Sequence, residues 1–206
     1  MPSADRTTVI QGWVDRLRQG DQAARAALLG CAADRLARLT RKMLKGYPGV
    51  ARWEQAEDVL QNALIRLDRA LKAVTPPTAR DFFRLAAAQV RRELIDLARH
   101  YQGPRGLGAH HETRAGRGDS AAGTPMAAES PDTTYNPGRL AAWAEFHAAV
   151  AALGEADREL FDLLWYQGLT QAEAAGILGV TERTVNSRWL AARVRLGDTL
   201  GGQLPI

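Results

Sequence analysis

The chain has 206 residues, of which 46% are hydrophobic and 24% are charged, a composition typical of a folded globular protein and unlike that of a disordered or fibrous one. Lys and Arg number 27 against 23 Asp and Glu, so the net charge of +4 alone indicates no particular partner. Nearly all of the basic residues are Arg, whose planar guanidinium fits phosphates and guanine edges, although GC-rich coding explains the same preference.

Composition also excludes several kinds of protein. The single cysteine, Cys31, excludes an intramolecular disulfide and a zinc site of several cysteines, and we expect it to pack as a small apolar side chain. No apolar run approaches the roughly 20 residues that cross a bilayer, and the first residues, MPSADRTTV, lack the apolar core of a secretory signal. The sequence therefore predicts a cytoplasmic protein without membrane insertion.

Three helices are predicted in the first half of the chain. Asp21 is a typical N-cap for a helix over residues 22–45, which ends at the Gly-Tyr-Pro-Gly turn 46–49. A second helix is predicted over 54–71 and a third over about 80–100, and each carries an apolar stripe at helical spacing. Because these stripes can bury one another, we expect a helical bundle. The stripes consist of Val59, Leu60, Ala63, Leu64, Leu67 and Leu71, and of Phe83, Ala86, Val90, Leu94 and Leu97.

The composition changes between the two halves of the chain. Residues 102–138 are rich in Gly, Pro, Ser, Thr and Ala, and they have too few large apolar side chains to offset chain entropy, so we expect a flexible linker. Strand patterns are absent, and the fold class is therefore all-α, with two small helical domains over 1–101 and 139–206. The second core is expected to consist of Leu153, Leu160, Phe161, Leu164, Trp165, Ile177, Leu178, Val180, Val185 and Leu190.

The segment GLTQAEAAGILGVTERTVNSRWLAARVRL is typical of a helix-turn-helix. Gly168 can take the positive φ that ends a preceding helix, and Thr170 with Glu173 forms a capping box for a short helix over 171–178. Gly179 then supplies the tight turn. A tight hairpin that only packs is the alternative, but the coincidence of these signals favours DNA binding. The motif does not distinguish an activator, a repressor or a sigma factor.

The second helix of this motif carries residue types that recognise bases. Thr181 caps a helix over 182–196 in which Val185 faces inward, and Arg193 and Arg195 lie where phosphates are contacted. In helix-turn-helix proteins the N-terminal part of this helix enters the major groove. Base recognition is therefore expected from Arg183, Thr184, Asn186, Ser187 and Arg188.

Two further faces in the first half are candidate binding surfaces. The helix over 80–100 has a basic face, which by itself is more often a solvated surface than a nucleic-acid site, and Phe82, His100 and Tyr101 can stack on bases or simply pack. The helix over 54–71 has a second stripe on which a partner helix could dock. The two faces consist of Arg84, Arg91, Arg92 and Arg99, and of Asp58, Gln61, Asn62 and Ile65.

Together these segments resemble the extracytoplasmic-function (ECF) group of the sigma-70 family. The stretch WEQAEDVLQNALIRL resembles the part of sigma region 2 that binds core RNA polymerase, and ARDFFRLAAAQVRRELIDLARH resembles the part that handles the −10 element. The stretch LGEADRELFDLLWYQGLTQAEAAGILGVTERTVNSRWLAARVRL resembles sigma region 4, which recognises the −35 element. The resemblance implies a sigma region 2-like bundle and a sigma region 4-like helix-turn-helix.

The resemblance also implies roles for single residues. It implies partners, namely core RNA polymerase through its β′ clamp helices and β subunit, promoter DNA and an anti-sigma factor, and it implies no cofactor, no metal and no enzymatic activity. Docking on the clamp helices is implied for Asp58, Gln61, Asn62 and Ile65. Contact with −10 DNA is implied for Arg84, Arg91, Arg92, Asp96 and Arg99. Contact with −35 DNA is implied for Thr181, Arg183, Thr184, Asn186, Ser187, Arg188 and Arg193.

The sequence departs from the family pattern near the −10 segment. The family often has a Trp before the basic helix and an Asn within it, where this chain has Phe82-Phe83 and Gln89-Val90-Arg91. These departures affect the details of strand opening and leave the two-lobed assignment unchanged.

Three other interpretations compete with this one. A polymerase-independent regulator would carry the same helix-turn-helix and occupy a duplex operator alone. A serine recombinase is disfavoured, because no serine lies in an ordered N-terminal catalytic pattern. A metal site at His110, His111 and Glu112 is disfavoured, since this trio sits in a glycine-rich stretch without a further well-placed ligand.

Overall fold

The computed structural model describes residues 3–43, 49–102 and 137–202, and within these ranges every regular element is helical, which confirms the all-α prediction. The N-terminal region contains α1 (Ser3–Arg18), α2 (Gln22–Met43), α3 (Gly49–Ala73) and α4 (Ala79–Gln102). The C-terminal region contains α6 (Pro137–Ala152), α7 (Glu155–Phe161), the π-helical turn η1 (Asp162–Tyr166), α8 (Gln171–Leu178) and α9 (Glu182–Thr199).

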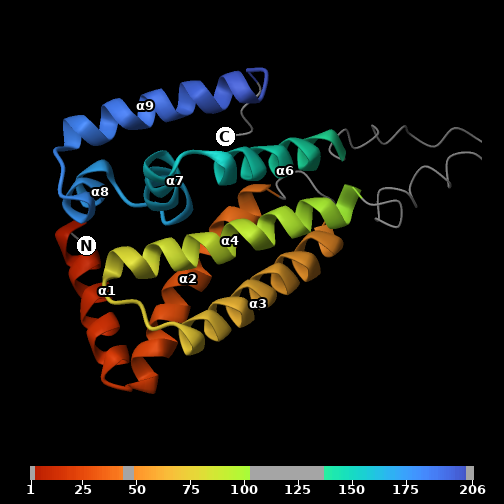
Figure 1. The fold of residues 1–206 in the computed structure, drawn as a ribbon. Coiled ribbons are helices and arrows are strands. Elements are labelled where there is room, and N and C mark those ends of the chain that lie inside the picture. Colours follow the sequence, from red (N-terminus) through yellow and green to blue (C-terminus); the bar gives the residue numbers. More distant parts are fainter. Residues whose placement is uncertain (1–2, 44–48, 103–136, 203–206) are drawn as a thin grey trace, which may run out of the picture.

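Helix α4 lies at the centre of the arrangement. Helix α3 runs along one side of it and α6 along the other, and α9 forms an outer layer beside α6 and α7 (Figure 1). Helix α8 lies next to α1, so the helix-turn-helix begins beside the first helix at one end of the molecule (Figure 1). The N-terminal and C-terminal regions are thus packed directly against each other.

The buried apolar side chains form two clusters, and both draw on both regions. One contains Trp143, Phe146 and Trp165 from the C-terminal region together with Val90 and Leu94 of α4. The other joins buried residues of α1 to α4 with buried residues of α7, η1 and α8, and with Val185 of α9. The second core expected from the sequence is therefore continuous with apolar surface of the N-terminal region.

Local signals explain where several helices begin. Asp21 caps α2, because its Oδ1 accepts hydrogen bonds from the backbone amides of Ala23 at 2.8 Å and Ala24 at 3.4 Å, as predicted. Helix α1 was not predicted, since its buried stripe is short and includes Ile10 and Val14 four residues apart. Its contacts with the rest of the bundle stabilise it more than its own pattern does.

Leu190 lies differently from the sequence prediction, and for Phe82 the structure decides between the two alternatives of packing and base stacking. Leu190, expected in the second core, is 62% exposed, because it sits about 140° around α9 from the fully buried Val185. Phe82 is 1% exposed and belongs to the core, so it is not available for base stacking in this arrangement. The side chains of His100 and Tyr101 and residues 103–136, which make up most of the predicted linker, lie outside the described part.

Candidate nucleic-acid interface

The predicted helix-turn-helix is present at residues 168–199. Thr170 Oγ1 accepts a hydrogen bond from the Glu173 amide at 3.2 Å, and the Glu173 carboxylate accepts one from the Thr170 amide at 2.6 Å, which is the predicted capping box of α8. Gly179 ends α8 with φ of +66°. Thr181 then caps α9, since its Oγ1 accepts a hydrogen bond from the Thr184 amide at 3.2 Å. Local sequence signals therefore determine where α8 begins and ends and where α9 begins.

Helix α9 presents a polar N-terminal face to solvent. Val185 is fully buried beneath it and anchors the helix to the core. Gln171 donates a hydrogen bond to Asn186 Oδ1 at 3.4 Å and links the two helices of the motif, while Arg195 pairs with Asp157 at 2.5 Å. Thr184 is half-buried, and the exposed predicted −35 residues are Thr181, Arg183, Asn186, Ser187, Arg188 and Arg193.

Gly168 occupies a position that a side chain cannot take without a shift. Its φ is +65°, and a Cβ atom there would lie 2.6 Å from the guanidinium carbon of Arg35. That guanidinium donates hydrogen bonds to the backbone carbonyls of Trp165 and, at 2.7 Å, of Tyr166. Gly168 therefore allows α2 to approach the turn that precedes the helix-turn-helix.

Gly168→Ala is expected to lower the free energy of unfolding by about 1–3 kcal/mol, because it combines an unfavourable backbone conformation with a clash at Arg35. Gly176→Ala is the matched control, since a Cβ in the middle of α8 meets nothing within 4 Å. That control should be neutral or stabilising by up to about 1 kcal/mol. Urea denaturation of both variants measures the difference, and equal stabilities would contradict the described turn.

Helix α4 turns part of its basic face toward the C-terminal region. Arg84 pairs with Glu155 of α7 at 2.6 Å. Arg80, one turn earlier, makes a bidentate pair with Glu159 at 2.6 and 2.8 Å. The carboxylates of α7 therefore pair with guanidinium groups on the face of α4 where −10 DNA was expected to bind.

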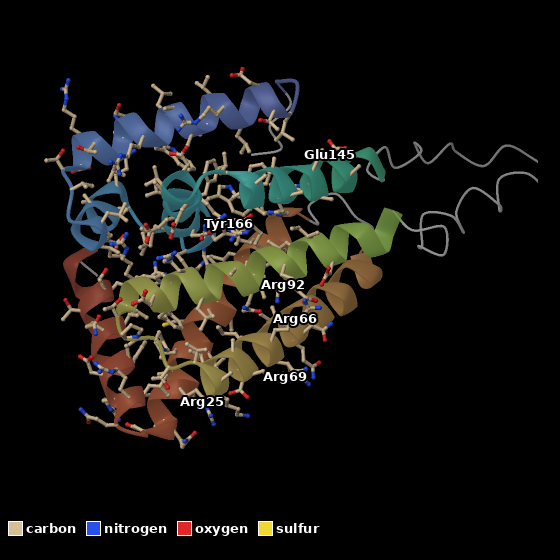
Figure 2. The ribbon with its side chains drawn as sticks, viewed as in Figure 1. Arg25, Arg66, Arg69, Arg92, Glu145 and Tyr166 are labelled. Carbon is tan, nitrogen blue, oxygen red and sulfur yellow. The ribbon has the colours of Figure 1, made fainter. Side chains whose placement is uncertain are left out.

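Arg91 is the most enclosed member of this face. It pairs with Asp162 of η1, and its guanidinium lies 5.3 Å from the centre of the Tyr166 ring. Burial raises the pKa of Asp162 to about 6, against the opposing effect of the Arg91 charge and hydrogen bond. Figure 2 shows Tyr166 between α4 and the C-terminal helices.

The remaining predicted −10 residues lie elsewhere on α4. Arg92 is exposed and lies on the α3 side of the helix (Figure 2). Asp96 pairs with Arg66 of α3 at 2.9 Å, and Arg66 also pairs with the buried Glu93 at 3.1 Å. The side chain of Arg99 lies outside the described part. The structure thus separates Arg92 from Arg84 and Arg91, which the sequence placed on one face.

Helix α3 carries the predicted polymerase-binding stripe on its outer surface. Gln61, Asn62 and Ile65 are exposed, and Ile65 is 40% exposed despite being apolar. The side chain of Asp58 lies outside the described part. An open groove of about 480 Å³ adjoins the stripe and is lined by Leu29, Leu60, Gln61, Leu64, Ile65, Asp68, Arg69 and Lys72. The surface combines an apolar floor with charged margins.

A buried histidine lies behind η1. His147 of α6 is fully buried, and its Nδ1 lies 2.7 Å from the Tyr166 hydroxyl. Burial, with the charge of Arg91, lowers the pKa of His147 to about 3. Unfolded histidine accepts a proton near pH 6.5, whereas the buried His147 stays neutral. The contribution of His147 to the stability of the fold is therefore fully present above pH 6.5 and is lost as pH falls toward 3. Asp162 acts in the opposite sense, because its raised pKa adds stability as pH falls from about 6 to about 4, and this stability is lost again as pH rises through 6.

His147→Gln is expected to change this balance. Glutamine can keep a polar contact with Tyr166 but has no proton to gain, so only the stabilising effect of Asp162 remains as pH falls. Relative to the natural chain, the variant should gain about 2 kcal/mol of unfolding free energy between pH 6.5 and 4.5. Urea denaturation across that range is the measurement. A constant difference between the two proteins would mean that His147 is not buried as a neutral ring.

The described residues hold no group of His, Cys, Asp and Glu side chains that could bind a metal ion, and His110, His111 and Glu112 lie outside them. None of the helices that the structure describes is long and apolar enough to cross a bilayer.

Comparison with protein families shows to which family the chain belongs. The family described as ECF sigma factor matches residues 7–201, nearly the whole length. The chain belongs to the ECF sigma factor family. As an ECF sigma factor it is a DNA-binding protein of transcription initiation, and the family is not a class of enzymes. The sequence-based family assignment is thereby confirmed.

Comparison with individual proteins adds little to this ECF sigma factor. No curated protein matches it. A solved structure, that of CnrH in complex with the cytosolic domain of CnrY, is similar at 22% identity and a TM-score of 0.37, covering 95% of this chain and 99% of that one.

Proposed function

We propose that this ECF sigma factor binds core RNA polymerase and directs it to promoters by recognising −35 and −10 DNA elements. The observation that carries the proposal is the exposed polar face of α9, capped and anchored as in DNA-reading helices, in a chain of this family. It acts in the cytoplasm, with an anti-sigma factor as a further expected partner and with no cofactor.

The −35 element is assigned to α9. Arg183 and Arg188 extend from the helix without an ion pair among the described residues, so their guanidinium groups are available for guanine or phosphate. Asn186 and Ser187 supply shorter donors and acceptors between them. Arg193, farther along the helix, is placed for a phosphate contact.

The −10 element is assigned to α4, within the predicted domain 1–101. Arg92 is exposed and can contact DNA in the described arrangement. Arg84 and Arg91 are paired with carboxylates of the C-terminal region, and Asp96 is paired with Arg66. Arg99 completes the proposed set. Two DNA-binding helices, α4 and α9, held on one polymerase would raise each other's effective concentration at the promoter. Neither helix therefore needs to bind DNA tightly alone.

Core polymerase is assigned to the outer face of α3. Gln61, Asn62 and Ile65, with Asp58, offer the mixture of amides, acid and one apolar side chain that suits docking of a partner helix. The adjoining groove supplies the apolar area, and the β′ clamp helices are the proposed partner. The β subunit of core polymerase is a further proposed partner, and the C-terminal domain 139–206 is assigned to the −35 element.

Asp58→Ala combined with Gln61→Ala is expected to reduce co-purification with core polymerase at least fivefold, because the two changes remove polar contacts from the docking stripe. Arg18→Ala on the exposed end of α1 is the control and should leave co-purification unchanged. Unchanged recovery of polymerase with the double variant would contradict the assignment of α3.

Run-off transcription tests the proposal as a whole. Purified protein is added to sigma-free core polymerase with a library of genomic fragments, and the expected result is initiation from a defined set of start sites. A protein that confers no start-site selection, while occupying an operator unaided, would be a polymerase-independent regulator instead.

A further inference from the structure

Leu190 exposes a large apolar side chain on α9, the helix that we assign to the −35 element. It is 62% exposed and lies about 140° around the helix from the fully buried Val185. Arg183 and Ser187 precede it by seven and three residues, so these side chains share one outward face. Covering an apolar side chain of this size is favourable, because its surface then leaves water. The outer face of α9 thus offers an apolar contact surface among polar side chains.

Asn186 is the neighbour of Leu190 on this face. The two residues are four apart, or about 40° around α9, so their side chains lie next to each other along the helix. Asn186 is exposed, and its Oδ1 accepts a hydrogen bond at 3.4 Å from Gln171, the first residue of α8. The amide oxygen therefore points toward α8. The amide nitrogen, Nδ2, points away from it and is a donor beside Leu190.

Local structure holds both ends of this hydrogen bond. Gln171 follows the N-cap Thr170, whose capping box fixes the start of α8, and Asn186 follows the buried Val185. An asparagine without such a bond can turn either its oxygen or its nitrogen outward, since the amide carries an acceptor on one side and donors on the other. The bond from Gln171 favours the orientation with the nitrogen outward. The surface at this point therefore presents a donor.

A donor beside an apolar group is complementary to one base edge. In the major groove thymine presents the acceptor O4 next to its C5-methyl group, whereas cytosine presents a donor and no methyl group. We propose that Asn186 donates from Nδ2 to O4 of one thymine in the −35 element, that Leu190 packs on the methyl group of the same thymine, and that Gln171 is the positioning residue for the amide. The inference rests on the proposed binding of −35 DNA by α9, and it adds the base that this part of the helix selects.

The same hydrogen bond disfavours adenine. An asparagine that binds adenine uses its oxygen to accept from N6 and its nitrogen to donate to N7. In this chain the oxygen of Asn186 already accepts from Gln171 and is turned toward α8. Asn186 therefore presents both groups to one base edge only if that bond breaks.

Two modified bases test the two contacts separately. Deoxyuridine lacks only the methyl group of thymine, and 5-methylcytosine, paired with guanine, keeps the methyl group but has an amino donor in place of O4. A promoter fragment found by run-off transcription is labelled with fluorescein, and each thymine of its −35 region is replaced singly. Fluorescence anisotropy measures the dissociation constant of each duplex from the full chain bound to core polymerase.

One thymine should respond to both replacements when the natural chain is used. Deoxyuridine should weaken binding about threefold to fivefold, the effect of losing one buried methyl group. The replacement by 5-methylcytosine should weaken it about tenfold, because a donor then faces a donor.

Single variants assign each effect to one side chain. Leu190→Ala should abolish the effect of deoxyuridine and keep that of 5-methylcytosine, and Asn186→Ala should do the reverse. Gln171→Ala should reduce the effect of 5-methylcytosine to about threefold, because the released amide can turn its oxygen toward the amino group. A merely structural role of Gln171 would instead weaken binding to all duplexes alike. Val194→Ala is the matched control, since it trims another exposed apolar side chain of α9, and it should keep both effects.

The inference is overturned if no thymine of the −35 region responds to deoxyuridine, or if Leu190→Ala responds as the natural chain does. Equal effects of 5-methylcytosine on the natural chain and on Gln171→Ala would remove the positioning role. Failure of the proposed function has a different signature, since the natural chain would then give no start-site selection in run-off transcription. Start-site selection without a response to deoxyuridine would reject the recognition of thymine and keep the sigma function.

Discussion

Phe146→Ala is expected to lower the free energy of unfolding by about 3–5 kcal/mol, the largest effect on stability that we predict. The Phe146 side chain is fully buried, and its ring centre lies 5.6 Å from that of Trp143 and 5.1 Å from that of Trp165. Truncation would leave a cavity among large rings that cannot close around it. Urea denaturation measures the change.

The neighbouring residue provides the control for this prediction. Glu145 is exposed on the same helix (Figure 2), and Glu145→Ala should change the unfolding free energy by no more than about 0.5 kcal/mol. A loss below about 1 kcal/mol for Phe146→Ala would mean that α6 does not pack into this cluster.

Arg188→Ala is expected to weaken promoter-directed transcription about 5- to 100-fold, because one good contact between arginine and a base is worth about 1–3 kcal/mol. Arg188 is exposed on α9 and forms no part of the apolar clusters, so binding to core polymerase should remain as it was. Run-off transcription and co-purification are measured in parallel.

For the role given to Arg188 to hold, Arg188→Ala must weaken transcription and leave co-purification with core polymerase unchanged. Arg18→Ala, at an exposed position on α1, changes the same charge far along the chain from α9 and should leave transcription unaffected. Loss of polymerase binding with intact promoter selection would contradict the role given to Arg188.

Sequence predicted the helix-turn-helix closely because its signals are local. The capping box of Thr170 and Glu173, the left-handed Gly179 and the cap at Thr181 each act within four residues of the chain. Backbone hydrogen bonding at these points is determined by neighbouring side chains, so distant packing has little influence on it.

The packing of the C-terminal region over α4 was not predictable from such local sequence signals. Arg91 and Arg92 are adjacent and chemically identical, yet one is buried against Asp162 and the other is exposed. The decisive partner of Arg91 lies 71 residues away in sequence. A helical wheel gives the direction of a side chain but not the element that it meets, which also explains why Leu190 was assigned to the core.

The bonds from Arg35 to η1 have a practical consequence for work with fragments of this protein. A fragment that begins at α6 would lack the guanidinium that binds the carbonyls of Trp165 and Tyr166. It would also expose the aromatic side chains that α4 now covers. Such a fragment would be prone to aggregation, so weak DNA binding by an isolated C-terminal half would report on its altered folding and not on the capacity of α9.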